Sequence, residues 1–306
     1  MRKNNEEKIN GFCLYTPGGA AREYAAVGCN LHRGCPYQCR YCYNRRGLTA
    51  KVMGVDHAVL EGKFSNLKNR PKSYLHLSGE EYAYFRFLQE VFKWKELLRR
   101  TGIFFSFSTD PLSDDCFSLT WKCISTVVKD HGIPVKVLTK NGLLTIQQIV
   151  EIDMIPMECR KLIAFGFTLT GRDDWESFAP KNIDRVLTMR TLHERGFKTF
   201  ASVEPIVDFS SSLGMIQKTL SFCDQYLIGL MSSRKANGLE PYSVDECGQF
   251  IHAVVDMCKG VSSVYWKDSV RKLMANDAEV LSIIEEGVSS TSVSRDWSLF
   301  TDIGKD

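Results

Sequence analysis

The sequence predicts an α/β fold in which parallel strands form a partial barrel. Short runs rich in β-branched and aromatic residues alternate with segments of helical periodicity along the 306 residues. Such alternation indicates parallel strands joined by right-handed crossovers, here about seven strands and about six helices. The composition, 44% hydrophobic and 25% charged, is that of an ordinary globular chain. We therefore expect a barrel short of eight strands, with its chemistry at the carboxyl ends of the strands.

The elements of the first half are expected from apolar strands and helix signals. A strand over residues 24–31 comes directly before a cysteine-rich loop. Ser78 and Glu81 have the spacing of a capping box, which predicts a helix that runs to about Arg100 and ends before Gly102. The other elements expected in this half are a strand at 103–108, a helix at 117–131, a strand at 134–139 and a helix at 144–153.

The second half continues the same alternation. Val244, Cys247, Ile251, Val254 and Cys258 recur at helical spacing and mark a strongly amphipathic helix. The other elements expected here are strands at 162–170, 198–203, 225–231 and 261–266, and helices at 183–195, 213–222 and 268–274.

These elements divide the chain into an N-terminal extension (1–21), a barrel (22–275) and a C-terminal tail (276–306). Lys plus Arg is 39 and Asp plus Glu is 36, so the net charge of +3 does not mark a nucleic-acid binder. No apolar run approaches the ~18 residues of a membrane span, and the polar N-terminus has no apolar signal region. We expect a cytoplasmic protein without a membrane partner. Its eleven cysteines are then expected to be metal ligands or core residues rather than disulfides.

The most specific feature is a loop with three cysteines in eight residues. Cys35, Cys39 and Cys42 have the spacing Cys-x3-Cys-x2-Cys and follow the first expected strand. Thiolates favour zinc or iron–sulfur clusters, and three thiols on a four-iron cluster leave one iron open for chemistry. The alternative is a structural zinc ion, for which His32 would complete a Cys3His set.

This loop resembles the signature of the radical SAM superfamily, and the stretch 30–44 is similar to the branch that includes spore photoproduct lyase. The resemblance implies a partial (βα)6-type TIM barrel with a short C-terminal extension. It implies a [4Fe-4S] cluster on Cys35, Cys39 and Cys42, with S-adenosylmethionine (SAM) on the fourth iron. Tyr41 stands at the aromatic position of the signature and is expected among the SAM contacts. A reductant such as a flavodoxin or ferredoxin would supply the electron.

Polar residues at two strand ends are candidate contacts for the methionyl part of SAM. Ser108, Thr109 and Asp110 end the strand at 103–108, and the resemblance assigns them to the amino group of SAM. Lys140 follows the strand at 134–139, and the same branch places a lysine here near the carboxylate of SAM. A lysine suits this task because it is a mobile point charge.

Further candidates follow the later strands. Thr168 is expected near the ribose or carboxylate of SAM, and Glu204 near the ribose or the substrate. Arg234 and Lys267 are candidate substrate contacts on the same rim. The segment 78–80 looks superficially like another acidic SAM motif, but its capping-box pattern indicates a helix start instead.

The sequence thus favours a radical SAM enzyme that forms a 5′-deoxyadenosyl radical and removes a hydrogen atom from a substrate it does not identify. Two alternatives are repair of a DNA lesion, as in spore photoproduct lyase, and a zinc-stabilised binding protein without catalysis. The near-neutral charge gives little support to a nucleic-acid substrate.

Overall fold

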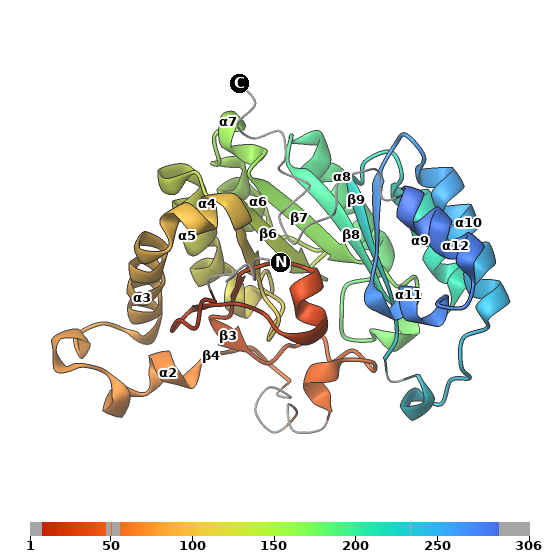
Figure 1. The fold of residues 1–306 in the computed structure, drawn as a ribbon. Coiled ribbons are helices and arrows are strands. Elements are labelled where there is room, and N and C mark those ends of the chain that lie inside the picture. Colours follow the sequence, from red (N-terminus) through yellow and green to blue (C-terminus); the bar gives the residue numbers. More distant parts are fainter. Residues whose placement is uncertain (1–7, 47–49, 51–55, 233, 288–306) are drawn as a thin grey trace, which may run out of the picture.

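The computed structural model describes residues 8–46, 50, 56–232 and 234–287, and its centre is one sheet of eight strands (Figure 1). The strands lie in the order β1-β2-β5-β6-β7-β8-β9-β10. Only the pair β1 and β2 is antiparallel, so the sheet is an open, mostly parallel partial barrel, as predicted. The bounds are β1 Leu14–Tyr15, β2 Gly28–Cys29, β5 Ile103–Phe105, β6 Val135–Thr139, β7 Ile163–Thr168, β8 Lys198–Ile206, β9 Gln225–Leu230 and β10 Ser263–Trp266.

Helices cover the outer face of this sheet (Figure 1). The strands separate two apolar regions, because successive side chains of a strand point to opposite faces. In β6, Val135 and Val137 join the large core under the helices, whereas Leu138 packs with Phe104 and Phe200 in the barrel interior. The α-helices are α2 Gly62–Ser65, α3 Gly79–Lys93, α4 Lys95–Thr101, α5 Asp114–His131, α6 Ile146–Asp153, α7 Met157–Arg160, α8 Asn182–Glu194, α9 Phe209–Thr219, α10 Val244–Cys258, α11 Asp268–Leu273 and α12 Ala278–Gly287. None of these helices is long and apolar enough to cross a membrane.

The first expected strand is shorter than predicted. Of residues 24–31, only Gly28–Cys29 forms β2, and the chain then pairs His32–Arg33 (β3) with Val59–Leu60 (β4) in a separate small sheet. The reason is Tyr24, whose ring packs with the apolar side chains of the barrel interior. The segment before β2 therefore enters the interior instead of extending the sheet edge.

The long helix expected from residue 78 is divided in two. Its start is as predicted, because the Ser78 hydroxyl accepts from the N–H of Glu81 and the Glu81 carboxylate accepts from the N–H of Ser78. At Trp94 the backbone leaves helical geometry, with φ −110° and ψ 15°, and α4 begins after it. Leu98 of α4 is buried in the core.

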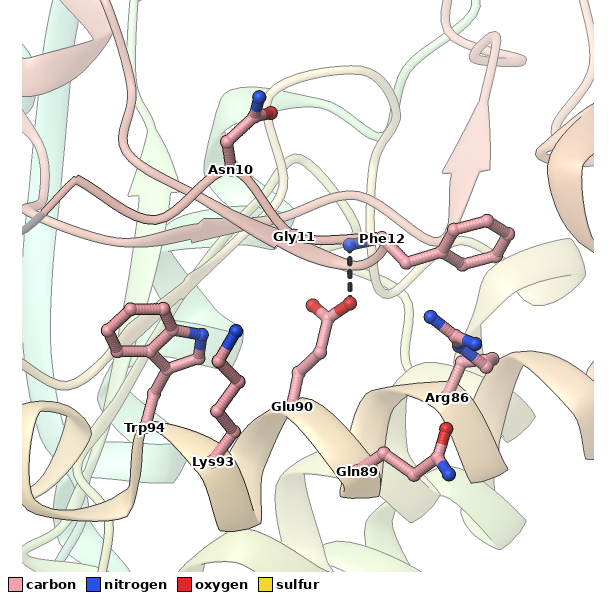
Figure 2. Close-up of a pocket in the computed structure, with 8 residues that line it drawn as sticks. All are labelled: Asn10, Gly11, Phe12, Arg86, Gln89, Glu90, Lys93 and Trp94. Atoms are coloured by element: carbon pink, nitrogen blue, oxygen red, sulfur yellow. Dashed lines mark hydrogen bonds between the residues drawn. The ribbon is translucent and has the colours of Figure 1, made fainter.

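A buried carboxylate fixes the N-terminal hairpin to α3 (Figure 2). Glu90 accepts from the backbone N–H groups of Phe12, Cys13 (2.9 Å) and Leu14 (2.8 Å). Three donors compensate this carboxylate for its loss of water. A cavity of about 450 Å³ lies beside it, with Arg86 and Trp94 in its wall. It shares no lining residue with the cysteine loop.

Part of the segment expected as a C-terminal tail is a helix. α12 packs against α10, and its Val280 and Ile284 are buried in the main core. The remaining residues of that segment, 288–306, lie outside the described part of the chain.

Candidate active site

The three cysteines of the loop lie between β3 and a short 3-10 turn, η2 (Tyr43–Arg45), at the carboxyl-end side of the sheet. All three are free thiols; Cys39 is buried, and Cys35 and Cys42 are half-buried. The loop turns tightly, since Gln38 adopts a positive φ of 45° and the N–H of Cys42 donates to the carbonyl of Cys39 (3.0 Å). One short loop thus carries all three thiols, and two of them are partly accessible.

The thiols do not converge on a single point. Among the residues described, no three His, Cys, Asp or Glu side chains are grouped so that they could hold one metal ion. A zinc site needs four donors around one ion, and His32 with the three thiols does not form that set here. Cysteines on an iron–sulfur cluster bind different irons, so their sulfur atoms can lie apart. The donor chemistry of the loop fits such a cluster.

Asp110 joins the ends of β5 and β6 next to this loop. Its Oδ1 accepts from the Thr139 hydroxyl (2.6 Å) and the N–H of Leu112 (3.1 Å), and its Oδ2 accepts from the N–H of Lys140 (2.6 Å). Burial raises the pKa of Asp110, and these hydrogen bonds oppose that rise. A carboxylate has about four lone-pair sites, so one on Oδ2 stays available to a ligand.

The loop, Asp110 and Lys140 are electrostatically coupled. Burial, reinforced by Asp110, raises the pKa of Cys35 to about 12, and burial also raises that of Cys39. Lys140 lowers the pKa of both thiols. Burial disfavours the ammonium of Lys140, but Cys39 and Glu176 outweigh it and raise the Lys140 pKa. Lys140 thus opposes, without cancelling, the rise that burial causes in the pKa of Cys35 and of Cys39.

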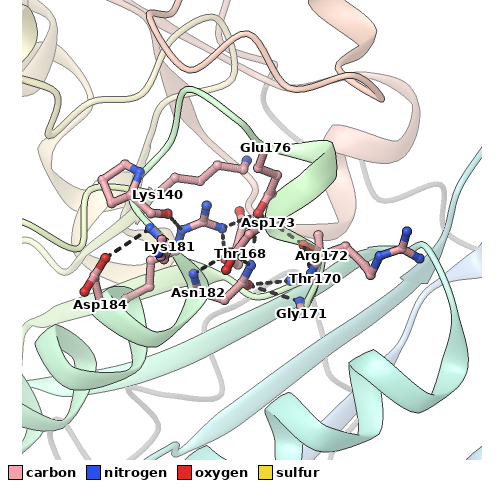
Figure 3. Close-up of polar contacts among 12 residues, drawn as sticks. Lys140, Thr168, Thr170, Gly171, Arg172, Asp173, Glu176, Lys181, Asn182 and Asp184 are labelled. Atoms are coloured by element: carbon pink, nitrogen blue, oxygen red, sulfur yellow. Dashed lines mark hydrogen bonds and ion pairs between the residues drawn. The ribbon is translucent and has the colours of Figure 1, made fainter.

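A buried polar network surrounds Glu176 at the end of β7 (Figure 3). The Tyr41 hydroxyl donates to Glu176, and the Glu176 carboxylate also accepts from Arg185 Nη1 (2.7 Å) and the Thr170 hydroxyl (3.1 Å). Asn182 supports it from the first turn of α8 (3.3 Å). Glu176 and Arg185 are fully buried, so each depends on the other for charge compensation.

One donor group of this network has no acceptor. Arg185 Nη1 also donates to the carbonyl of Thr168 (2.9 Å), but its Nη2 is buried without a hydrogen-bond partner in the described part of the chain. The Lys140 ammonium lies 5.6 Å from the centre of the Tyr41 ring. Two cationic groups thus border Tyr41, and one of them carries an unused buried donor.

A second polar cluster lies where the barrel would close, at the ends of β8 and β10. Lys267 Nζ pairs with Glu204 (2.6 Å) and with Glu23 (3.5 Å), and its side chain is 2% exposed. The Tyr24 hydroxyl donates to Glu204 (2.6 Å) and lies 2.8 Å from the Ser202 hydroxyl. We call these five residues the closing-edge cluster. They satisfy one another and hold the segment before β2 across the gap.

The predicted site residues therefore fall into groups. The structure brings the three cysteines, Tyr41, Asp110 and Lys140 to one end of the sheet. Ser108 and Thr109 lie beside them, but the Ser108 hydroxyl donates to the carbonyl of His32 (2.6 Å) and the Thr109 hydroxyl lies 3.5 Å from Cys116 Sγ. These two assignments to SAM stay predictions.

Arg234 lies in the loop after β9, where its guanidinium contacts other residues of the chain. Its Nη1 donates to the carbonyl of Val207 (2.7 Å), and its guanidinium lies 4.0 Å from the centre of the Tyr242 ring.

Sequence reasoning missed Tyr24 altogether, because the segment 24–31 carries only the signal of an apolar strand. Glu176 and Arg185 are separated by nine residues, and no short motif reveals that they pair.

No protein-family model matches the sequence. The chain is 24% identical over 222 residues to an uncharacterized protein of Methanocaldococcus jannaschii, and the match covers 70% of this chain and 73% of that protein. It is similar in structure to a mutant of spore photoproduct lyase with bound AdoMet and a dinucleoside spore photoproduct, at 12% identity and a TM-score of 0.50. That match covers 80% of this chain and 64% of the lyase.

A weaker likeness is found to Streptococcus suis SuiB bound to S-adenosylmethionine, at 9% identity and a TM-score of 0.43, over 57% of this chain and 41% of SuiB. The chain thus spans less than two thirds of either enzyme. At these identities the likeness concerns the fold. The chain has the partial-barrel fold found in spore photoproduct lyase.

Proposed function

We propose that the chain is a radical SAM enzyme. The observation that carries the proposal is the three-thiol loop beside Asp110 and Lys140 at the carboxyl ends of β5 and β6. Cofactor chemistry in parallel α/β barrels is built at this end of the sheet. The fold shared with a SAM-binding lyase supports the same reading.

The residues at this end of the sheet suit both an iron–sulfur cluster and SAM. Cys35, Cys39 and Cys42 would hold a [4Fe-4S] cluster, and Lys140 lowers the pKa of the Cys35 and Cys39 thiols against the effect of burial. When bound and reduced by one electron, such a cluster would supply the reductive cleavage of SAM to methionine and a 5′-deoxyadenosyl radical, which would abstract a hydrogen atom from the substrate. The chain's part is to position SAM and to exclude water from it.

The methionyl end of SAM carries one cationic and one anionic group, and the site offers a partner for each. The open lone pair of Asp110 Oδ2 suits the ammonium. The carboxylate suits the cationic Lys140 Nζ beside Tyr41, and it suits Arg185 Nη2, which is a buried donor without an acceptor in the described part of the chain. Tyr41 is fixed between these groups by Glu176.

The proposal extends to a one-electron reductant of the flavodoxin or ferredoxin class and to a cytoplasmic setting, where eleven free cysteines would stay reduced. It does not name the substrate. DNA lesion repair is the second candidate, favoured only by the spore photoproduct lyase branch that the loop resembles.

The test is anaerobic reconstitution of the full chain with iron, sulfide, SAM and dithionite. We expect about four irons per chain and formation of 5′-deoxyadenosine that depends on SAM. Deuterium transfer from candidate substrates into 5′-deoxyadenosine would identify the substrate class. A colourless protein that binds one zinc ion per chain would refute the proposal.

A further inference from the structure

The loop that carries the three thiols has no regular structure of its own. Residues 34–42, all within the described part of the chain, form neither helix nor strand. Such a loop samples many conformations unless contacts with the rest of the fold restrain it. A site built from three ligands needs that restraint, because ordering a loop on binding costs affinity. The contacts that restrain this loop therefore belong to the function of the site.

One set of contacts holds the end of the loop to β5. The Tyr43 hydroxyl and Asn44 Nδ2 (3.1 Å) both donate to the carbonyl of Phe107, which follows β5. These bonds fix the chain just after Cys42. They do not reach the segment 39–41, which must be held from elsewhere.

A second set of contacts holds Arg40 to two loops of the other half of the sheet. The N–H of Arg40 donates to the carbonyl of Trp175 (2.9 Å), and its guanidinium lies 4.5 Å from the centre of the Trp175 ring. Its Nη2 donates to the carbonyl of Asn237 (3.2 Å). Trp175 lies in the 3-10 turn η5 (Asp173–Trp175) after β7, and Asn237 lies in η6 (Lys235–Asn237) after β9.

Arg46 strengthens this connection from the far side of the loop. Its Nη2 donates to the carbonyl of Arg40 (3.1 Å) and to Asn237 Oδ1. Asn237 is 5% exposed, and its Nδ2 donates to Met231 Sδ (3.3 Å). Trp175 is also buried, in a small apolar cluster with Met231. The two arginines therefore contact partners that are themselves buried and fixed.

We propose that these four residues position the thiols. We call Arg40, Arg46, Trp175 and Asn237 the loop clamp, and none of them supplies a thiol. The clamp holds the segment between Cys39 and Cys42 in the conformation that receives the cluster. The identity of the bound group rests on the proposed function, whereas the restraint is a property of the chain without that group. The thiol site then depends on loops after β7 and β9, far along the chain from the cysteines.

Arg45 offers a matched comparison within the same loop. Arg40 and Arg45 are both exposed arginines that flank cysteines of the motif. The Nη1 of Arg45 donates only to Gln38 Oε1 (2.9 Å), seven residues away, and does not reach the loops after β7 and β9. A general effect of removing an arginine from this loop would appear in both positions. A clamp would depend on Arg40 alone.

The test starts with hydrogen exchange of the segment 38–46 in the full chain before reconstitution, measured by mass spectrometry under anaerobic, reducing conditions. Arg40→Met removes the guanidinium contacts, and Asn237→Ala removes the side-chain acceptor of Arg46. Arg40→Lys keeps a cation for the Trp175 ring and is the conservative variant. Arg45→Met is the control.

Each variant is then reconstituted with ferrous iron and sulfide. Its iron loss to a chelator and the EPR spectrum of its dithionite-reduced cluster are recorded. We expect exchange and iron loss to be about tenfold faster in Arg40→Met, less affected in Asn237→Ala and Arg40→Lys, and unchanged in Arg45→Met. The EPR spectrum of Arg40→Met should broaden, because its thiols are no longer held in one arrangement. Thermal unfolding should not distinguish Arg40→Met from Arg45→Met.

Equal exchange in the wild-type chain and Arg40→Met overturns the proposal, and so does an equal effect of Arg45→Met. Unchanged iron loss and an unchanged EPR spectrum in Arg40→Met also overturn it, because the clamp would then not act on the cluster. The exchange experiment needs no iron. A wild-type chain that shows the expected order of exchange but takes up no cluster would therefore refute the proposed function and not the restraint.

Discussion

The two polar regions at the mouth of the barrel differ in how far their groups satisfy one another. At the ends of β5 to β7, three thiols stand beside Lys140 and a buried guanidinium nitrogen of Arg185 that lacks an acceptor. In the closing-edge cluster, Lys267 pairs with Glu204 and Glu23, and Tyr24 donates to Glu204. The first region retains unused binding capacity, and the second has used most of its own.

This difference separates two kinds of polar residue that look alike in sequence. Glu204 and Lys267 follow strands in the same way as Asp110 and Lys140, so strand-end position alone predicts a ligand site for all four. The structure shows that Glu204 and Lys267 hold the segment before β2 across the barrel gap. We therefore expect the thiol side to govern cofactor binding and the closing-edge cluster to govern stability.

The largest effect is expected from the thiols. Replacing Cys35, Cys39 or Cys42 by Ala should remove the cluster and reduce SAM cleavage to background, because one loop supplies all three ligands. Iron content measures the loss of the cluster, and 5′-deoxyadenosine formation measures the loss of SAM cleavage. Cys247→Ala is the control: Cys247 is fully buried among apolar side chains, so its loss should leave iron content unchanged. A full cluster in any of the three loop variants would contradict the assignment.

The next largest effect is expected on stability, from a substitution in the closing-edge cluster. Lys267→Met should lower the free energy of unfolding by about 3 kcal/mol, since it leaves the Glu204 and Glu23 carboxylates without their cation. Thermal unfolding should show a fall in Tm of roughly 5–10 °C. The affinity for SAM should change little.

Lys235→Met is the matched control for this variant, because Lys235 is exposed in the loop after β9. It should change neither the Tm nor the affinity for SAM. If Lys267→Met unfolds like wild type but loses SAM or substrate binding, the closing-edge cluster is part of the ligand site and the comparison fails.

A smaller effect is expected from the groups assigned to SAM. Lys140→Met and Asp110→Asn should each weaken SAM binding by about 1.5–3 kcal/mol, or roughly ten- to a hundredfold. Asp110→Asn keeps the shape of the side chain and so limits damage to the joint between β5 and β6. Titration of SAM into anaerobic, reconstituted protein measures the affinity.

Glu80→Ala is the control for these two variants. Glu80 is exposed in the first turn of α3, and Ser78 and Glu81 already form the helix cap there. A loss of SAM affinity on Glu80→Ala, with Asp110→Asn silent, would move the amino-group site to the segment 78–80.

Local signals predicted the fold well. Each strand from β5 to β10 is an apolar run with turn residues at its ends, and its position follows from the chain itself. The capping box at Ser78 and Glu81 is a contact over three residues and was predicted correctly. The three cysteines are recognisable as candidate ligands because all three lie in one short loop.

The features that the sequence did not predict depend on contacts between residues that are far apart in the chain. Tyr24 lies 178 residues from its partner Ser202, and Glu90 lies 78 residues from Phe12. Nothing in the neighbourhood of Tyr24 or Glu90 indicates either contact. The prediction that Lys267 faces a substrate rested on its place after a strand, whereas its pairing depends on where the N-terminal segment lies.

The smallest effect concerns His32, which lies beside the thiol loop in β3. It is buried, and its Nδ1 has no partner in the described part of the chain. Burial lowers its pKa from 6.5 to about 4, and Asp115 only partly opposes this. Below pH 6.5 the unfolded chain therefore takes up a proton that the folded chain does not, so stability falls as the pH falls from about 6.5 to 4.

Between pH 7.5 and 5.5 this group should cost the wild-type chain about 1 kcal/mol of unfolding free energy. Urea unfolding at the two pH values measures the loss, and the same measurement on His32→Gln isolates it, because that variant retains every other titrating group. The variant should lose about 1 kcal/mol less than wild type over this interval. An equal loss in both chains would mean that His32 is protonated in the fold and has an acceptor there. His32 Nδ1 would then have a hydrogen-bond partner, as the polar groups of the closing-edge cluster do.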